Sequence, residues 1–212
     1  MENNTFAGKI ALTFDDGPHE VTDSVLDCFK KHGGVATFFV MGNRIAQPEN
    51  HARAVRALDE GHDVASHSYD HVHLSELTRD EIIEQIKKTD TILNDITGNK
   101  LPPFMRTPYF AYSKEMASTI AEFDYALIHA SVDPNDWDDA MDTDGIVKNV
   151  MSQARDGSIV LLHDVHERTR EAVERIVPEL ISKGFKLVTV SELLSERVGV
   201  IEPGVVYEHG HK

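Results

Sequence analysis

Short apolar, β-branched segments alternate along this chain with longer amphipathic segments. The apolar segments predict strands at residues 9–14, 35–41, 63–66, 104–106, 125–129, 158–162 and 185–190. The amphipathic segments predict helices at residues 22–32, 48–60, 78–96, 114–122, 143–155 and 169–183. Repeated strand–helix alternation predicts an α/β protein with a parallel sheet, either closed into a barrel or doubly wound.

Local signals support several of these helix ends. Thr78 followed three residues later by Glu81 predicts a capping box at the start of the third helix. Gly98 and Gly184 follow the last apolar positions of the third and sixth helices and predict their ends.

The chain predicts a single domain. No repeat, low-complexity segment or long linker interrupts its 212 residues, a length that suits one barrel. We expect one domain over residues 1–212, with its core at about 9–194 and a tail at 200–212. The ending VYEHGHK is predicted to be frayed, with its two histidines outside any site.

Composition narrows the class of protein. Hydrophobic residues make up 41% of the chain and charged residues 27%, as in ordinary globular proteins. No apolar run approaches the roughly 18 residues of a membrane span. Asp and Glu total 36 against 21 Lys and Arg, a formal net charge of −15. Such an excess repels phosphate backbones and anionic membranes, so we expect neither nucleic acid nor a membrane as a partner.

Cysteine and histidine counts bear on the chemistry. The single Cys28 excludes an internal disulfide and a cysteine-built zinc site, and its place in SVLDCFKKHG predicts a core residue. Histidine occurs 12 times, and imidazole is the commonest metal ligand in proteins.

Functional groups of parallel α/β proteins gather beyond the carboxyl ends of the strands. Five of the seven predicted strands are followed there by ionisable or metal-binding side chains, whereas the strand interiors carry almost none. This clustering predicts a site at that edge of the sheet. The groups are Asp15, Asp16, His67, His71, Arg106, the acids of SVDPNDW, and His163.

The first predicted strand ends in the doublet Asp15-Asp16, within TFDDGP. A continuing strand would send the two carboxylates to opposite faces of the sheet. Gly17 and Pro18 follow directly, and a turn there would bring both acids to the same opening. An isolated Asp-Asp-Gly-Pro is more often a solvated turn. The groups at the other strand ends favour a shared site here.

Asp16, His67 and His71 form a candidate set of metal ligands. The histidines are four positions apart, so on a helix or tight turn their rings share a face. Two imidazoles and one carboxylate leave open positions for water and suit Zn²⁺, and also Fe, Co or Mn. Asp15 is placed to take a proton from bound water, whose pKa falls to about 7 on catalytic zinc. His163, from another strand end, is placed to act as an acid.

The motifs TFDDGP, HSYDH, RTPY, DPNDW and LLHD resemble, in sequence and order, the five motifs of the polysaccharide deacetylases, carbohydrate esterase family 4. Each motif alone is a weak signal, but five in the right order are specific. The resemblance covers about residues 9–194. It implies a distorted (β/α)7 TIM-like barrel, and the metal-assisted hydrolysis of N-acetyl or O-acetyl groups on carbohydrate polymers.

The resemblance implies roles for the residues that match its motifs. Asp16, His67 and His71 match the ligands of one divalent metal ion, with Zn first and Co, Mn, Ni or Fe as alternatives. Asp15 matches the catalytic base, and His163 matches the general acid.

Five further residues match supporting positions of the family. Arg106 resembles the residue that pairs with the base, and Asp136 resembles the partner that favours the charged form of His163. Trp137 and Leu161 match the apolar pocket for the acetyl methyl group. Tyr109 would lend its backbone N–H to the oxyanion, because the preceding proline has none.

The chain departs from the family pattern at three positions. Thr107 stands where a second proline is frequent, Phe110 where glycine is common, and Ser66 where asparagine is usual. The first two are expected to narrow or reshape the cleft. None removes a proton-transfer group or a metal ligand, so we expect an active enzyme.

Other polar residues receive weaker assignments. His19 is a candidate for the cleft edge, and His73 and His166 are minor candidates for substrate contact. Asp133 is expected in turn formation, and Asp164 as a helix cap or hydrogen-bond partner rather than a catalytic group. The histidines expected to be structural or exposed are His32, His51, His62 and His129.

Two rival functions stay open at this point. Two histidines and a carboxylate also suit an Fe(II) oxygenase, but that function does not explain Arg106, Asp136 or His163. A non-catalytic carbohydrate-binding barrel would not need Asp15 and His163.

The partner expected from the resemblance is an acetylated oligosaccharide or polysaccharide, bound by a monomer. Chitin, chito-oligosaccharide, peptidoglycan and xylan deacetylases share the core residues, so the glycan stays open. The start MENNTFAGK has no signal-peptide pattern. The family implies a secreted or cell-envelope protein, and a cytoplasmic one is the alternative.

Overall fold

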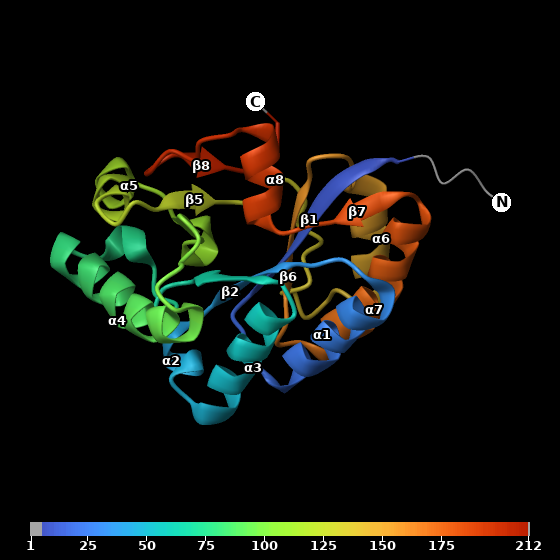
Figure 1. Ribbon diagram of the computed structural model, residues 1–212, viewed down its shortest axis with the longest axis horizontal. Coiled ribbons are helices and arrows are strands. Elements are labelled where there is room, and N and C mark those ends of the chain that lie inside the picture. Colours follow the sequence, from blue (N-terminus) through green and yellow to red (C-terminus); the bar gives the residue numbers. More distant parts are fainter. Residues whose placement is uncertain (1–5, 212) are drawn as a thin grey trace.

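A computed structural model describes residues 6–211 and shows a curved, all-parallel sheet surrounded by helices (Figure 1). The strands pair in the order β6-β1-β2-β3-β4-β5-β8, and β7 pairs with β1. The predicted α/β class and the distorted (β/α)7 barrel are confirmed, with β8 as an additional short strand. The strands are β1 Gly8–Asp15, β2 Thr37–Val40, β3 Asp63–Ser66, β4 Phe104–Met105, β5 Ala126–Ile128, β6 Ile159–His163, β7 Phe185–Leu187 and β8 Val206–Tyr207.

The six predicted helices are confirmed, with ends that lie within two residues of the expected ones. Two further helices, α2 and α8, were not predicted. The α-helices are α1 Glu20–His32, α2 Gly42–Ile45, α3 Pro48–Asp59, α4 Arg79–Thr97, α5 Lys114–Ala121, α6 Thr143–Gln153, α7 Glu167–Ser182 and α8 Val190–Arg197. Two short 3₁₀ helices lie at Leu74–Glu76 and Pro108–Phe110.

The predicted capping box starts α4 as expected. The backbone N–H of Thr78 donates to Oε2 of Glu81 at 2.8 Å, and the N–H of Glu81 donates to Oγ1 of Thr78 at 3.4 Å. Gly98 ends the helix with φ 62°, the left-handed conformation that glycine adopts without strain.

Alternation along the strands divides the buried side chains between the two faces of the sheet. Inward-facing residues fill the barrel, and the residues between them pack against the surrounding helices. The inner cluster includes Ala11, Phe39, Ala65, Phe104, Ala126, Ile128 and Ile159. The outer cluster includes Leu12, Phe14, Phe38, Val40, Val64, Val160 and Leu162.

Helix α8 closes the end of the barrel where the strands begin. Its apolar residues Val190, Leu193 and Leu194 belong to the inner cluster. The N–H of Val190 donates to Oγ1 of Thr37 at the start of β2, at 2.9 Å. The barrel interior is therefore packed at this end, and its other end is left for the site.

Two expectations for the C-terminal part of the chain were wrong. Residues 185–190 do not form one strand, because β7 ends at Leu187 and Thr189 caps α8 by accepting from the N–H of Glu192. The tail is not frayed, since β8 pairs with β5 and Nε2 of His211 donates to the Asp156 carbonyl at 2.8 Å. A two-residue strand carries too little periodicity to be seen in the sequence, and only its place beside β5 creates it.

Strand register brings predicted site residues level with one another. Asp15 of β1 is paired in register with His163 of β6, and Thr13 is paired with Leu161. Registered neighbours in a parallel sheet face the same side, so all four side chains point into the barrel. Arg106 follows β4 directly and donates its backbone N–H to Ser66 of β3 at 3.0 Å.

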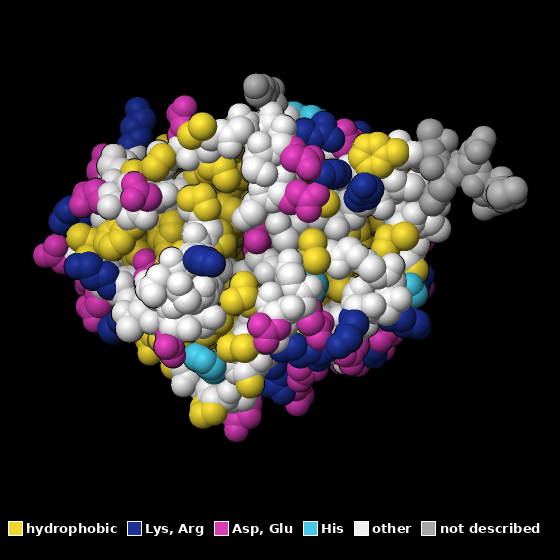
Figure 2. Space-filling view, viewed as in Figure 1, with side chains coloured by type: hydrophobic (Ala, Val, Ile, Leu, Met, Phe, Trp, Pro, Cys, Tyr) yellow, Lys and Arg dark blue, Asp and Glu magenta, His cyan; other side chains and the backbone are white. Residues whose placement is uncertain are grey.

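Charged side chains of both signs are interspersed over the face seen in Figure 2, with hydrophobic groups between them. No α-helix among residues 6–211 is both long and apolar enough to cross a membrane.

His62 is buried beside the first strands. It is 3% exposed, and its Nδ1 accepts a hydrogen bond from the Ala36 N–H at 2.9 Å. The rings of Phe29 and Phe38 lie edge-on to it, each with a centroid distance of 5.4 Å. Burial lowers the pKa of His62 to about 4. The histidine is therefore a neutral core residue, and of the two expectations for it, structural or exposed, the structure shows the first.

This burial makes the free energy of unfolding depend on pH. The unfolded chain binds a proton at His62 near pH 6.5, whereas the folded protein binds it near pH 4. The contribution of neutral His62 to the free energy of unfolding is therefore complete above about pH 6.5. It is lost as the pH falls from about 6.5 to about 4, by about 3 kcal/mol in all. In His62→Asn, which keeps an acceptor for Ala36 but does not titrate, urea unfolding should lose less stability between about pH 7.5 and about pH 4.5. An equal loss in both proteins would contradict the assignment.

Candidate active site

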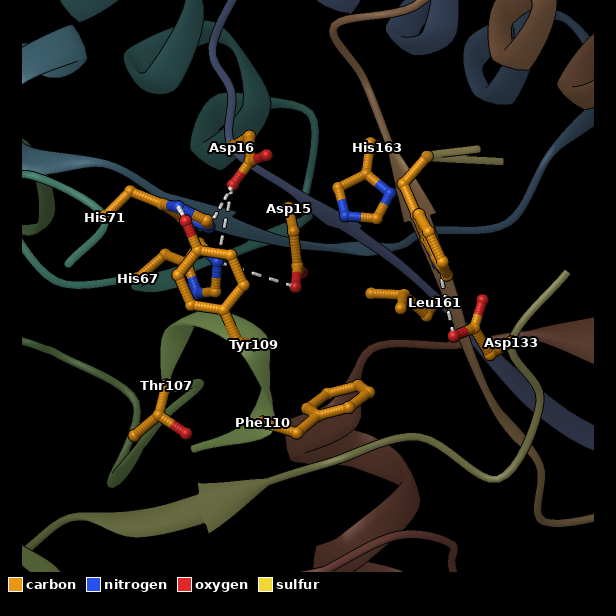
Figure 3. A pocket seen from close by; sticks show the side chains of 11 residues that line it. Asp15, Asp16, His67, His71, Thr107, Tyr109, Phe110, Asp133, Leu161 and His163 are labelled. Carbon is orange, nitrogen blue, oxygen red and sulfur yellow. Dashed lines mark hydrogen bonds and ion pairs between the residues drawn. The ribbon is translucent and has the colours of Figure 1, made fainter. Parts of the chain in front are cut away.

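A cavity of about 400 Å³ opens at the carboxyl ends of the strands (Figure 3). Eight of the ten residues predicted for the site line it, and the other two, Arg106 and Asp136, lie buried behind it. Three lining residues were not among the predicted ones. The full lining comprises Asp15, Asp16, His67, His71, Thr107, Tyr109, Phe110, Asp133, Trp137, Leu161 and His163.

The turn after β1 explains how adjacent aspartates reach one cavity. Asp16 has φ 70°, a left-handed conformation that breaks the strand and turns its carboxylate to the same side as that of Asp15. Gly17 then packs on the carboxyl of Asp164, where a Cβ would lie 2.3 Å from Oδ1. The predicted turn therefore needs a residue without a side chain at this position.

Asp164 supports this turn through a buried hydrogen bond and a close contact with Gly17. It is fully buried, and its Oδ2 accepts from the Thr22 hydroxyl at 2.5 Å. Burial raises the pKa of Asp164 to about 7, and the nearby Asp16 and Asp15 act in the same direction. Of the two roles expected for Asp164, the structure shows the hydrogen-bond partner, which links β6 to the start of α1.

The predicted ligand trio comes together. Oδ1 of Asp16 lies 3.1 Å from Nε2 of His71 and 3.4 Å from Nε2 of His67. One ligand atom from each residue lies within 4.8 Å of the others. His67 donates its Nδ1–H to the Arg106 carbonyl at 2.8 Å, which leaves a lone pair on Nε2 of the neutral ring.

These contacts test whether a cation fits the trio. Oδ1 of Asp16 is buried and has no hydrogen-bond partner among the described residues. An anionic oxygen that faces the lone pair of an imidazole at this distance needs a positive charge between them. The donor set of two nitrogens and one oxygen therefore fits a divalent metal.

The second histidine of the trio has its own support. The hydroxyl of Tyr109 lies 3.2 Å from Nδ1 of His71. The Tyr109 ring in turn stacks on His73, with centroids 3.8 Å apart and planes at 15°. His73, a minor candidate in the sequence, is therefore placed behind the cavity wall rather than on the lining.

Arg106 holds Asp15 through a buried ion pair. Its Nη1 lies 2.7 Å from Oδ1 of Asp15 and donates also to the Thr13 hydroxyl, at 2.7 Å. Nε and Nη2 donate to the carbonyls of Ile128 and His129, each at 3.0 Å. A buried guanidinium with partners on all three nitrogens is fixed in orientation, and so is the carboxylate it holds. Removal of either partner would leave an uncompensated buried charge, at a cost of about 3–5 kcal/mol.

Asp136 holds His163 in the same way but with opposite charges. Oδ1 of Asp136 accepts from Nδ1 of His163 at 2.7 Å. Oδ2 accepts from the His163 backbone N–H at 2.8 Å and from the Thr169 hydroxyl at 2.7 Å. Burial would lower the pKa of His163, but the hydrogen bond and charge of Asp136, with the charges of Asp15 and Asp16, raise it to about 9. His163 is therefore protonated at neutral pH.

The remaining predicted residues line other parts of the cavity, Tyr109 beside His71 and Trp137 beside Asp133. Tyr109 has φ 60°, and no hydrogen bond from its backbone N–H to a described residue is found. Trp137 is 54% exposed, and its Nε1 donates to Oδ2 of Asp133 at 3.4 Å. Leu161 is 5% exposed at the cavity floor. Asp133 has a role in its turn, as expected, because its Oδ1 accepts from the Asn135 N–H at 2.8 Å.

Some contributors had no assignment in the sequence. Thr13 lies two positions before Asp15 on the same strand face, so alternation alone could have placed it beside Arg106. Thr169 reaches Asp136 from α7, and no local pattern signals such a contact. His19 caps α1 and His166 lies 6.3 Å from the His163 ring, and neither lines the cavity.

The fold and the site define a parallel α/β barrel with a candidate metal centre at the carboxyl ends of its strands. A family model described as polysaccharide deacetylase matches residues 2–128. The chain belongs to the polysaccharide deacetylase family, as the five motifs predict.

Three relatives show what the chain is similar to. A peptidoglycan-N-acetylglucosamine deacetylase of Listeria monocytogenes is 42% identical over 194 residues, 91% of this chain and 40% of that protein. A chitin deacetylase of Arthroderma benhamiae is 38% identical, over 91% of this chain and 53% of that protein. The solved structure of a family 4 acetyl xylan esterase from Clostridium thermocellum, with a cobalt ion, has a TM-score of 0.87 at 31% identity, over 94% of this chain and 98% of that one.

The extents of these matches differ. The chain spans 40% and 53% of the lengths of the two curated relatives, but nearly the whole of the esterase structure. The shared part is therefore the barrel that carries the site.

We expect substitutions at Gly17 and Asp164 to have non-additive effects on metal affinity. A Cβ in Gly17→Ala would lie 2.3 Å from Oδ1 of Asp164, so the turn must move and take Asp16 with it. We expect Zn²⁺ affinity to fall by about 10–100-fold, as for other residues that orient metal ligands. The double variant with Asp164→Ala removes the clashing atoms and should recover most of the affinity. Competition with a chromophoric chelator measures both effects.

The control for this coupling is Gly145→Ala in α6, which should leave Zn²⁺ affinity unchanged because its nearest neighbour is the flexible Met141 side chain. Wild-type affinity in Gly17→Ala would contradict the role given to the turn.

His163 should titrate unusually high in metal-free protein. Its folded pKa of about 9 exceeds the ordinary 6.5, so its pair with Asp136 stabilises the protein fully below pH 6.5 and loses that effect as pH rises through 9. Asp136→Asn removes the negative partner and should bring the His163 pKa down toward or below 6.5. NMR titration of the imidazole, assigned with His163→Gln, measures the shift. The same pKa in both proteins would show that Asp136 does not control His163.

Proposed function

We propose that this chain is a metal-dependent deacetylase that hydrolyses the acetyl groups of acetylated glycans. Polymers or oligomers of N-acetylglucosamine are the favoured substrates, because the curated relatives with 38–42% identity are named for peptidoglycan and chitin. O-acetylated xylan is the second candidate, favoured by the likeness to the acetyl xylan esterase structure. The observation that carries the proposal is two buried ion pairs of opposite polarity beside the ligand trio. Asp15 lies against the cationic Arg106, and His163 lies against the anionic Asp136. Asp15 and His163 themselves are in register on neighbouring strands.

Asp16, His67 and His71 would hold the divalent ion. When bound, such an ion supplies a Lewis acid that polarises the acetyl carbonyl and lowers the pKa of water. Zn is the first candidate for its identity, with Co, Mn, Ni and Fe as alternatives, because all accept two imidazoles and a carboxylate.

Asp15 and His163 divide the proton transfers. Asp15 takes a proton from water as the oxygen of that water bonds to the acetyl carbon, and Arg106 keeps the carboxylate in place. His163, protonated at neutral pH, gives a proton to the leaving nitrogen or oxygen as its bond to the acetyl carbon breaks. The products are acetate and a free amine or hydroxyl group.

Three residues would bind the acetyl group during these steps. The Tyr109 N–H, which has no partner among the described residues, donates to the oxyanion that develops on the carbonyl oxygen. Trp137 and Leu161 contact the methyl group from the apolar side of the cavity. Loss of one oxyanion donor costs about 3–4 kcal/mol in comparable sites.

The proposed place of action follows from the substrate. Peptidoglycan and chitin, the glycans for which the curated relatives are named, are polymers of the cell envelope and cell wall. We therefore place the protein in the envelope or outside the cell, as a monomer that binds its glycan at the open cavity.

Asp15→Asn tests the assigned base. The amide cannot accept the proton, so acetate release should fall by about 10²–10⁴-fold. Zinc content should stay at the wild-type level, because the three ligands are unchanged. The exposed Asp59→Asn on α3 is the matched control and should keep full activity. Near-normal acetate release by Asp15→Asn would show that another group is the base.

Acetate release from chito-oligosaccharides and from acetylxylan tests the function itself, in protein stripped of metal and then given Zn²⁺, Co²⁺ or Mn²⁺. We expect release only after a metal is restored, and faster release from the N-acetyl substrate. Binding of either glycan without acetate release would favour a carbohydrate-binding barrel. Oxygen uptake with a 2-oxo acid would favour an oxygenase.

A further inference from the structure

Phe110 occupies a backbone conformation that a phenylalanine adopts rarely. It ends the 3₁₀ helix Pro108–Phe110 with φ 51°, and Tyr109 before it has φ 60°. Glycine takes such a conformation without strain, whereas a bulky side chain makes it unfavourable. The rest of the structure therefore has to hold the ring in place.

Two contacts hold this ring at the cavity. Its centroid lies 4.7 Å from that of His129. Cζ of Arg106 lies 5.6 Å from the ring centre, and Phe39 covers the same guanidinium at 4.2 Å. Phe110 lines the cavity with Leu161 and Trp137, so the ring presents a surface to a bound molecule. A strained backbone that carries a cavity-lining ring points to a role at the site.

The reaction geometry indicates which part of a substrate would meet Phe110. In the proposed function the carbonyl oxygen lies at the Tyr109 N–H and the leaving atom faces His163. The third substituent of the carbonyl carbon, the acyl chain, must then point away from His163. In Figure 3 the His163 imidazole and the Phe110 ring lie at opposite ends of the cavity residues in this view, with Asp15 and Leu161 at a level between them.

We propose that Phe110 is a specificity-determining residue that closes the far end of the acyl pocket, so that the site accepts acetyl and rejects longer acyl groups. The inference rests on the proposed function. Leu161 and Trp137 contact the methyl group, and the Phe110 ring fills the space that further methylenes would need. One misplaced methylene in a packed pocket changes kcat/KM by about 10–200-fold, so the closure is strong enough to select acetyl.

Chito-oligosaccharides acylated with acetyl, propionyl or butyryl groups test the pocket directly. The measured quantity is the ratio of kcat/KM for the longer acyl group to that for acetyl, from the acid released. We expect Phe110→Gly and Phe110→Ala to raise this ratio by at least about tenfold. Tyr112→Ala is the matched control, because Tyr112 lies two residues away, is 51% exposed and does not line the cavity. Its ratio should equal that of the wild type.

Comparison of the two Phe110 variants separates the effect of removing the ring from the effect of relieving the backbone strain. Both remove the ring, but only glycine also relieves the strain at φ 51°. Phe110→Gly should therefore melt about 2–4 °C above Phe110→Ala, while both show the same change in acyl ratio. If the ring only supports Arg106, rates for all acyl groups fall together and the ratio stays constant, which would overturn the proposal.

A binding measurement keeps this inference separate from the proposed function. Acetohydroxamate and butyrohydroxamate are small metal chelators that place an acyl chain next to the bound ion. Calorimetry on zinc-loaded protein should show that the wild type prefers acetohydroxamate and that Phe110→Gly loses this preference. If no substrate releases acid but Phe110→Gly still loses the preference for acetohydroxamate, the proposed function fails and the pocket assignment stands. If acetate is released but neither preference changes, the pocket assignment fails alone.

Discussion

The buried ion pair between Arg106 and Asp15 is the interaction on which the site depends. Arg106 is completely buried, and its guanidinium donates to Asp15, to a hydroxyl of β1 and to two carbonyls at the end of β5. Its own carbonyl accepts from Nδ1 of His67 and so sets which nitrogen of that ring can bind a metal. One residue at the end of β4 therefore orients the carboxylate proposed as the base, selects the tautomer of His67 and ties together strands on both sides of the barrel. A buried charge with so many partners tolerates little displacement.

The second constraint is that Asp15 and His163, the two groups proposed to transfer protons, have partners of opposite sign. Asp15 lies against a guanidinium, whereas His163 lies against the carboxylate of Asp136, which is itself buried and satisfied by three hydrogen bonds. Strand register makes Asp15 and His163 direct neighbours on β1 and β6. The barrel thus sets the distance between the two groups, and their buried partners fix the orientation of each side chain. Neither property depends on the mobile ends of long side chains.

Much of this could be predicted from the sequence for identifiable reasons. Strand–helix alternation indicates the α/β class, and the rule that parallel strands present chemistry at their carboxyl ends brings Asp15, His67, Arg106 and His163 to one edge. Five motifs in order then assign the roles, and all ten assigned residues lie at or directly behind one cavity. The errors fall where local signals are weak. β8 has two residues, and α8 begins inside a run that resembles a strand.

The sequence by itself determined the fold class, the order of the elements and the types of group at the strand ends, because these follow from periodicity and local chemistry. Tertiary structure alone decided how close those groups come and what surrounds them. The support that Asp164 gives to the predicted turn at Gly17 and the ring of Phe110 at the cavity arise between segments far apart along the chain. Such contacts depend on how the barrel closes, and no pattern within one segment contains that information.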